Sequence, residues 1–374
     1  MAQISRVNST LYHKALRAAL ELKENGWAII NDVLTNEECK AYVDGCWDWL
    51  ESLGTGIKRD DPGTWDDSKW PPTFKGIINT LGVAHQDFVW RVRSHPNVVQ
   101  VFELLLGTSE LLTSFDSINI TRPATKAVST ESWLHCDQAP TRRGWVCVQG
   151  LVNMVDVSAE TTGSLKVRHQ SHKGHAQYFG QGEFERRTGT TAEQKAEMRD
   201  YYQFTAAERP WWEERYEGMG LPGKAGSMFI WDSRTAHENV SPFPTSDWRH
   251  VLYVCYQPRS LAKQQDLEVK QRAYREHRST THWPSQNVTL FPTLEEATAS
   301  YYKDSDGREP AENGQSAQQT KPPWKEVRSR DAVESKRVLE LAGMQEYAAH
   351  EARNTRGFIQ MSEEELASLN AAAS

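Results

Sequence analysis

Two histidines and one aspartate constrain this chain more than any other feature. His135 and Asp137 lie two residues apart within residues 133–137, and His237 follows much later, at the end of residues 231–237. On a β-strand, residues i and i+2 point to the same side, so the first pair can reach one ion together. The set fits the 2-His-1-carboxylate triad, which binds Fe(II) on one face and leaves positions open for O2 and a co-substrate. The alternative is a histidine that lies near an aspartate on the surface by chance.

Arg249 adds a second element to this pattern. It lies twelve residues after His237, beyond a turn-rich stretch and at the start of the apolar segment 251–254. If the two strands pair as a hairpin, Arg249 returns beside the metal. Its planar guanidinium can bind a carboxylate through two hydrogen bonds, as the distal carboxylate of 2-oxoglutarate requires. A surface arginine at the start of a strand is the alternative.

From about Gly26 to Pro258 the chain resembles the phytanoyl-CoA dioxygenase family of Fe(II)/2-oxoglutarate oxygenases. The resemblance rests on the entry strand 26–34, the His135/Asp137 pair, the stretch 163–167, and the strand 226–231 that leads to His237. It implies Fe(II), 2-oxoglutarate and O2 as cofactor and co-substrates, with His135, Asp137 and His237 as metal ligands. It also implies decarboxylation of 2-oxoglutarate to succinate, coupled to oxidation of a substrate C–H bond.

The second contact to 2-oxoglutarate departs from the family pattern. The family often has a hydroxyl residue two positions after the distal histidine, where this chain has Asn239, with Ser241 two residues further on. An asparagine amide can still donate to a carboxylate. Polar and apolar residues alternate strictly over residues 117–121, which predicts a strand with one polar face. If its apolar face packs inward, the polar side chains line a cavity and are further candidates for this contact: Ser117, Asn119 and Thr121.

The order of predicted elements indicates an α+β fold. Apolar spacing predicts helices over residues 10–24 and from Pro96 to Gly107, and a strand over residues 27–34. A capping box at Thr35 predicts the start of another helix, which its apolar spacing continues. Short strands broken by turns over residues 111–258 suit a cupin-like jelly roll, the double-stranded β-helix. We therefore expect the following organisation: N-terminal helices and entry strand that support the barrel (1–110), catalytic core (111–258), helical extension (259–302), flexible connection (303–323) and C-terminal helices (324–374).

Several residues are candidates for substrate contacts. Arg142 and Arg143 could meet an anionic group, and Trp133, Trp145 and Trp231 could wall the pocket; solvated charge and core filling are the respective alternatives. A further candidate is the loop with histidines at positions 169, 172 and 175. Their spacing permits a second metal, but the family carries a Pro-Gly-Ser-His-Lys loop at this place, so a structural or substrate-facing loop is the preferred interpretation.

Composition limits the classes of partner. The 374 residues include 43 Lys and Arg against 50 Asp and Glu, a formal charge of −7, which argues against nucleic acid and anionic membranes as partners. Apolar runs of membrane-spanning length and a signal sequence are not found, and the five cysteines are widely spread, so we expect a cytoplasmic protein with free thiols. The C-terminal helices pack either on the barrel or on a second subunit in a homodimer.

The expected function is hydroxylation of a small organic substrate. Relatives that halogenate carry Gly or Ala at the position of Asp137, so its presence favours hydroxylation, although desaturation, cyclisation and epimerisation use the same ligands. Two alternatives remain open: the same chemistry on a protein side chain or a flipped nucleobase, and a jelly-roll binding module without catalytic activity.

Overall fold

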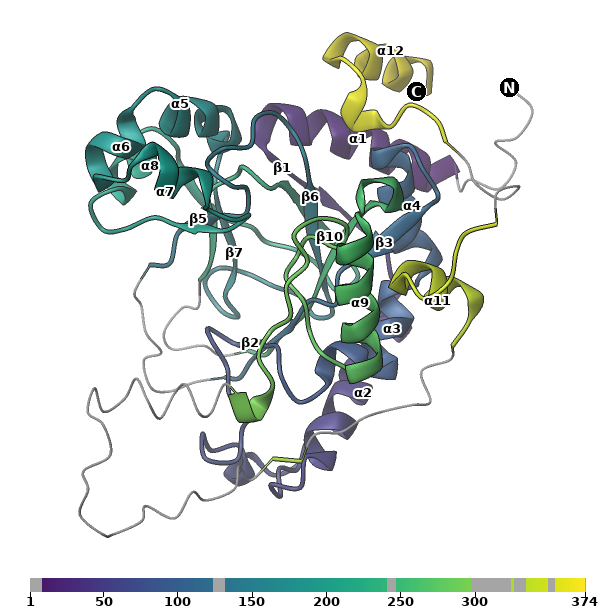
Figure 1. Ribbon diagram of the computed structural model, residues 1–374. Coiled ribbons are helices and arrows are strands. Elements are labelled where there is room, and N and C mark those ends of the chain that lie inside the picture. The colour runs from purple at the N-terminus through teal and green to yellow at the C-terminus, as the bar shows by residue number, and fades with distance from the viewer. Residues whose placement is uncertain are drawn as a thin grey trace, which may run out of the picture.

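The computed structural model describes residues 9–123, 132–240, 247–296, 324–325, 334–348 and 354–373, which form two antiparallel sheets with helices around them (Figure 1). Within these ranges the larger sheet has seven strands: β1 (Trp27–Ile30), β10 (Met228–Asp232), β6 (Val148–Asn153), β12 (Arg249–Pro258), β4 (Ile118–Thr121) and β2 (Ile77–Ile78) in this order, with β3 (Leu111–Thr113) also paired to β12. The smaller sheet has five described strands: β8 (Tyr202–Gln203), β5 (His135–Cys136), β11 (His237–Val240), β7 (Ser164–Arg168) and β9 (Gly218–Gly220).

The two sheets pack face to face. Leu151 and Val251 of the larger sheet form one buried cluster with Leu165 and Val167 of the smaller one. The outer face of the larger sheet is covered by N-terminal helices, and a continuous apolar core lies between them. These helices are α1 (Ser9–Asn25), α2 (Asn36–Ser52), α3 (Asp87–Arg93) and α4 (Pro96–Leu106).

Local signals predict most of these helices correctly. The Thr35 side chain accepts the Glu38 backbone N–H, and the Glu38 carboxylate accepts that of Thr35, so the predicted capping box is confirmed. Gly107 ends α4 in the left-handed conformation, at φ 75°. The entry strand β1 is shorter than predicted, because Asp32 adopts a positive φ and the following N–H groups bond to Gly226 instead of continuing the strand.

The predicted hairpin between the His237 and Arg249 strands is wrong. Strand β11 pairs with β5 and β7, whereas β12 pairs with β6, β4 and β3 in the other sheet, and no pairing between β11 and β12 occurs among the described residues. The two strands therefore belong to different sheets. Arg249 donates to Asn239 of β11 across the space between the sheets rather than from a neighbouring strand.

A helical insertion interrupts the strands of the core, where the sequence predicts only strands and turns. It contains α5 (His175–Gly180), α6 (Glu183–Thr188), α7 (Ala192–Ala196) and α8 (Arg209–Glu213). These short helices surround their own aromatic cluster, which includes Tyr178, Phe179, Phe184 and Trp212. They lie together at one side of the molecule (Figure 1).

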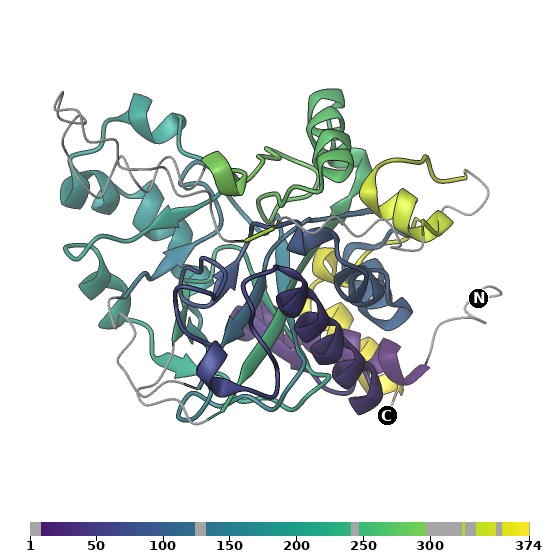
Figure 2. The same ribbon diagram turned by 90° about the horizontal axis from the view of Figure 1, so that it is seen from below.

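The C-terminal part packs against the N-terminal helices and one sheet edge. Helix α9 (Gln264–Glu276) lies within the predicted helical extension, 259–302, and α11 (Lys336–Ala342) packs against β3 and α9. Helix α12 (Glu363–Ala373) lies beside α1 of the same chain (Figures 1 and 2). The predicted flexible connection, 303–323, lies outside the described residues. Single-turn 3₁₀ helices complete the fold: η1 (Pro62–Thr64), η2 (Val83–His85), η3 (Ser171–Gly174), η4 (Arg259–Leu261) and η5 (Phe358–Gln360).

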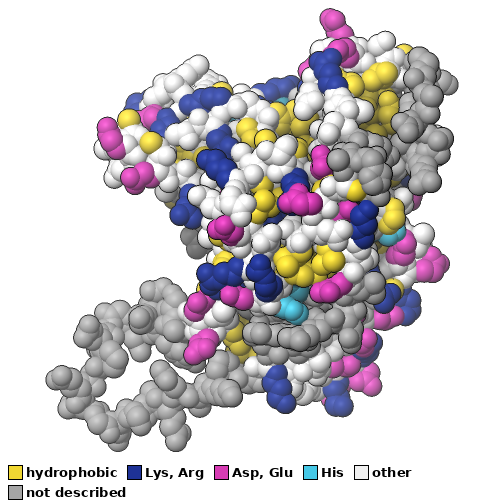
Figure 3. Space-filling view, turned by 45° about the vertical axis from the view of Figure 1, so that its right-hand side comes forward, with side chains coloured by type: hydrophobic (Ala, Val, Ile, Leu, Met, Phe, Trp, Pro, Cys, Tyr) yellow, Lys and Arg dark blue, Asp and Glu magenta, His cyan; other side chains and the backbone are white. Residues whose placement is uncertain are grey.

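The surface mixes both signs of charge. On the face shown in Figure 3, acidic and basic side chains are interspersed over the described residues. None of the described helices is both long and apolar enough to span a bilayer. All five cysteines are buried as free thiols, as the sequence predicts.

Candidate metal centre and its cavity

His135 and His237 are direct register partners on the adjacent strands β5 and β11. Their ring centroids are 4.3 Å apart. Asp137 follows directly after β5, and its backbone N–H donates to the carbonyl of Ser233. Among the described residues, these three form the group whose ligand atoms could hold a metal ion, all within 4.8 Å of one another. Strand pairing therefore brings together side chains that lie about a hundred residues apart in the sequence.

The two imidazoles are oriented by their own backbone. Nδ1 of His135 donates to the carbonyl of Trp133, and Nδ1 of His237 donates to that of Thr235, both at 2.9 Å. The proton is thereby held at Nδ1, so each Nε2 keeps a free lone pair for a metal. Burial, together with the nearby His237, lowers the pKa of His135 to about 3. The neutral form that ligates a metal is therefore the stable one.

Asp137 supplies the negative charge of the group. Its Oδ2 lies 3.2 Å from Nε2 of His237 and 3.8 Å from Nε2 of His135. Burial acts to raise the pKa of this carboxyl, but His282, His135 and His237 together lower it below the ordinary range. Oδ1 of Asp137 accepts no hydrogen bond from the described residues. The site thus offers two imidazole nitrogens and one ionised carboxylate oxygen, a set suited to Fe(II).

His282 is a residue of this site that the sequence analysis missed. Its Nδ1 lies 2.5 Å from Asp116 Oδ2, and its Nε2 lies 3.7 Å from Asp137 Oδ1. The next residue, Trp283, donates its indole N–H to the backbone carbonyl of Asp137 at 3.0 Å. The sequence shows these residues only as the end of a charged helix, and nothing in their local pattern indicates the contact with the metal ligands.

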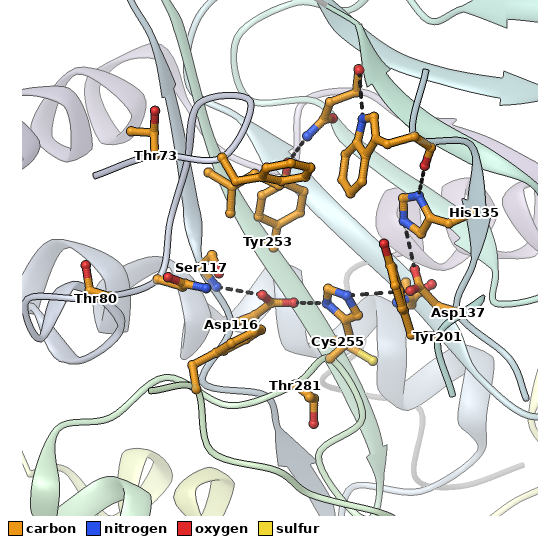
Figure 4. Close-up of a pocket in the computed structure, with 18 of the residues that line it drawn as sticks. Thr73, Thr80, Asp116, Ser117, His135, Asp137, Tyr201, Tyr253, Cys255 and Thr281 are labelled. Carbon is orange, nitrogen blue, oxygen red and sulfur yellow. Dashed lines mark hydrogen bonds and ion pairs between the residues drawn. The ribbon is translucent and has the colours of Figure 1, made fainter. Parts of the chain in front are cut away.

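A cavity of about 890 Å³ opens over the three residues. Figure 4 shows His135, Asp137 and Tyr201 at one side of it, with Thr73 and Thr80 at the other. Its wall is mainly non-polar and comes from both sheets, the loop before β2 and the segment after α9. The aromatic side chains of the wall are Trp70, Phe74, Trp133, Tyr201, Trp231, Tyr253, Phe291 and Trp324.

Arg249 lies fully buried behind the cavity wall. Its Nη2 donates to Oδ1 of Asn239 at 3.3 Å, and Nδ2 of Asn239 donates to the hydroxyl of Tyr253 at 2.5 Å. Asn239 and Tyr253 line the cavity. Nε and Nη1 of Arg249 have no hydrogen-bond partner among the described residues, and burial lowers the pKa of this guanidinium. Two donor nitrogens of this buried cation beside the cavity thus have no partner in the part of the chain that the structure describes.

The three polar candidates, Ser117 just before β4 and Asn119 and Thr121 on β4, lie in two different environments. Ser117 lines the cavity. Asn119 instead donates to the carbonyl of Lys75, and Thr121 donates to Asn119 at 3.0 Å. Neither Asn119 nor Thr121 belongs to the cavity wall, because the loop around Gly76 packs over them.

Of the substrate candidates, Trp133 and Trp231 line the cavity and three others do not. Trp133 stacks on His135 with ring centroids 4.4 Å apart. The placement of the other three corrects the prediction. Arg142 pairs with Asp200 at 2.8 Å, Arg143 donates to the carbonyls of Pro140 and Phe179, and Trp145 lies under the ammonium of Lys23. These three side chains thus contact local protein groups and lie outside the wall themselves, although Asp200, the partner of Arg142, belongs to it.

The three histidines of the 169–175 loop do not converge. His172 contacts the carbonyl of Lys23, and His175 contacts that of Gln138. His169 packs edge-on against Trp27. The loop therefore fits the structural interpretation rather than a second metal site. Ser241, an alternative donor to 2-oxoglutarate, lies outside the described residues.

Comparison with known proteins agrees with this geometry. The profile of the phytanoyl-CoA dioxygenase family matches residues 22–251. The chain belongs to this family. Ava biosynthesis cluster protein O of Aspergillus versicolor is 33% identical over 272 residues, which cover 72% of this chain and 86% of that protein. Membership places the protein in the general class of Fe(II)/2-oxoglutarate-dependent oxygenases.

More distant similarities include solved structures. A putative phytanoyl-CoA dioxygenase of Dictyostelium discoideum is 28% identical over 122 residues, which cover 31% of this chain and 34% of that protein. EctD from S. alaskensis, solved with 2-oxoglutarate and 5-hydroxyectoine, is 16% identical, with a TM-score of 0.44 over 65% of this chain and 76% of that one. The carbocyclase SnoK from nogalamycin biosynthesis is 17% identical, with a TM-score of 0.40 over 64% of this chain and 82% of that one.

Proposed function

We propose that the protein is an Fe(II)- and 2-oxoglutarate-dependent dioxygenase that hydroxylates a small organic molecule. The observation that carries the proposal is the convergence of His135, Asp137 and His237, whose ligand atoms lie within 4.8 Å of one another at the base of a cavity. The smaller sheet, which holds these residues, and the larger sheet that faces it correspond, we infer, to the two sheets of a double-stranded β-helix.

The chain's own residues prepare the site for the metal. Backbone carbonyls take the Nδ1 protons of His135 and His237, and their Nε2 atoms lie 3.8 and 3.2 Å from Oδ2 of Asp137, so the three ligand atoms are close enough to share one ion. When bound, Fe(II) with 2-oxoglutarate supplies the oxidation: O2 is consumed, 2-oxoglutarate is converted to succinate and CO2, and one C–H bond of the substrate becomes C–OH.

Arg249 is proposed to bind the distal carboxylate of 2-oxoglutarate. The guanidinium is buried and has two nitrogen atoms without partners in the described part of the chain, which is costly unless an anion completes the pair. Asn239 contacts Arg249 and lines the cavity, so it is proposed to orient this arginine toward the co-substrate.

The cavity favours a small molecule over a macromolecular substrate. Its volume of about 890 Å³ and its largely aromatic wall are typical of small-molecule sites, which measure roughly 300–1,000 Å³. The similarity to a protein named for a biosynthesis cluster supports the same conclusion.

Anaerobic addition of Fe(II) and then 2-oxoglutarate to the purified protein tests the proposal. We expect a weak visible charge-transfer band that is absent in His135→Ala, and formation of succinate once O2 is admitted. A folded protein that binds iron but shows neither the band nor succinate would refute the proposed function.

A further inference from the structure

Gln149 is a buried amide that the proposed chemistry leaves unused. It lies on β6, opposite Trp231 on one side and Cys255 on the other. Its side chain is 2% exposed and lines the cavity, yet neither Oε1 nor Nε2 has a hydrogen-bond partner among the described residues. Leaving a buried polar group unsatisfied costs roughly 1–3 kcal/mol. A side chain kept in this state inside a cavity indicates that a ligand completes its hydrogen bonds.

The charged groups around the cavity are already paired with one another. Arg122 lies 2.5 Å from Asp67, and His282 lies 2.5 Å from Asp116. Asp200 is paired with Arg142, and Asp137 belongs to the metal group. Within the described part of the wall, no charge is therefore left to bind an ionic substrate group, and the buried amide of Gln149 and the hydroxyl of Thr80 are neutral groups without a hydrogen-bond partner.

Gln149 is too far from Arg249 to serve the distal end of 2-oxoglutarate. Residues 249 and 255 point to the same face of β12, and six residues of strand span roughly 20 Å. Gln149 lies beside the Cys255 end, which is much further from Arg249 than a five-carbon dicarboxylate reaches. Its neighbour Trp231 packs against His237 with ring centroids 5.2 Å apart. Gln149 thus lies toward the metal ligands and away from the Arg249 end of the cavity.

We propose that Gln149 selects substrates that carry a neutral cyclic amide, a lactam, held against the aromatic wall. A carboxamide offers an acceptor and a donor side by side. Nε2 of Gln149 would donate to the lactam carbonyl, and Oε1 would accept the lactam N–H. A flat ring system that bears the lactam would pack on Trp133 and Trp231, which line the same cavity. The inference deepens the proposed function and rests on it.

Binding of two matched probes tests this inference. The probes are 2-quinolone, a bicyclic lactam, and coumarin, the lactone of the same shape that lacks the N–H. Calorimetric titration is carried out under argon on protein loaded with Fe(II) and 2-oxoglutarate. We expect the wild-type protein to bind 2-quinolone at least about 10-fold more tightly, since coumarin leaves Oε1 of Gln149 unpaired. In Gln149→Leu the preference should fall to within about 2-fold, with coumarin still bound.

Two further variants keep the test decisive. Gln149→Met retains the length of the side chain but has neither the amide donor nor the amide acceptor, so it should also lose the preference for 2-quinolone. Thr80→Val is the matched control, because it removes another buried and unpartnered group from the cavity wall. The lactam preference should survive in that variant.

The outcomes separate this inference from the function on which it rests. A preference that is absent in the wild type, kept in Gln149→Leu or lost in Thr80→Val would overturn the role of Gln149, as would failure of both probes to bind. The charge-transfer band is recorded on the same samples. Its presence in the wild type and in Gln149→Leu leaves the proposed function intact, whereas its absence from the wild type refutes that function itself.

Discussion

Arg249 and Asn239 connect the two sheets across the candidate active site, with Nη2 of Arg249 3.3 Å from Oδ1 of Asn239. The amide N–H of Asn239 donates to the hydroxyl of Tyr253, so both the oxygen and the nitrogen of this side chain are held by hydrogen bonds. Because the asparagine is neutral, it positions the guanidinium without neutralising it. No described carboxylate pairs with Arg249, so we expect an anion to complete this buried charge.

Arg249→Met should abolish tight binding of 2-oxoglutarate. Loss of a buried charge-assisted contact costs about 2–4 kcal/mol, which corresponds to a roughly 30- to 1,000-fold weaker affinity. Titration of the charge-transfer band with 2-oxoglutarate measures this change. Without 2-oxoglutarate the variant should be at least as stable as the wild type, because an unpaired buried charge has been removed.

Arg142→Met is the control for this prediction. Arg142 lies outside the cavity wall and pairs with Asp200, so its removal should leave the affinity for 2-oxoglutarate unchanged. An equal loss of affinity in both variants would show that net positive charge, rather than the position of Arg249, binds the co-substrate.

His135→Ala, Asp137→Ala and His237→Ala should each eliminate stoichiometric iron binding. The three ligand atoms form one compact group, and the described residues offer no fourth side chain of that group to replace a lost ligand. Iron content after anaerobic loading and desalting measures the effect. His169→Ala, on the loop whose spacing suggests a second metal, should bind iron as the wild type does. Loss of iron in His169→Ala would contradict the structural role of that loop.

The sequence predicts those parts of the site whose geometry is determined by a few consecutive residues. The capping box at Thr35 and the pair of His135 and Asp137 are contained in a few residues, so their geometry follows from local rules. His237 could be assigned because its role is implied by the family resemblance. The helices of the insertion were missed because each is shorter than two turns, too short for its apolar spacing to show a period.

The partners that depend on tertiary packing could not be read from the sequence. Two residues, Gln149 and His282, face the cavity only because β6 lies between β10 and β12 and because the segment after α9 folds back over the metal ligands. The pairing of β11 is likewise decided by which strands lie beside it in the smaller sheet. Sequence distance alone favours a hairpin with β12, and packing of the two sheets overrides it.

Trp133 should support His135 through ring stacking more than through its indole N–H. The rings are 4.4 Å apart, and the indole N–H donates to the backbone carbonyl of Asn239 at 3.2 Å. Trp133→Phe keeps an aromatic ring and loses one hydrogen bond, so we expect a loss of about 1 kcal/mol in stability and little change in iron affinity. Trp133→Ala also removes the packing that orients the ligand, which should weaken iron binding by about 10-fold or more. Thermal unfolding and iron titration separate the two effects, and equal iron affinities in both variants would contradict the role of stacking.

The metal-free protein should lose stability as the pH falls below about 6.5, in part through His250. This side chain is buried on β12 beside Trp248, and burial lowers its pKa from an ordinary value of 6.5 to about 4. Between these two values the unfolded chain binds a proton that the folded protein does not, so the free energy of unfolding decreases as the pH falls. The contribution of His250 lost at pH 5 is about 2 kcal/mol.

His250→Phe keeps the ring contact with Trp248 and cannot titrate, so its stability should fall less between pH 7 and pH 5 in urea unfolding. His13→Gln, a change at an exposed position, should keep the pH dependence of the wild type. If His250→Phe loses as much stability as the wild type over this range, proton uptake by His250 does not contribute to acid unfolding.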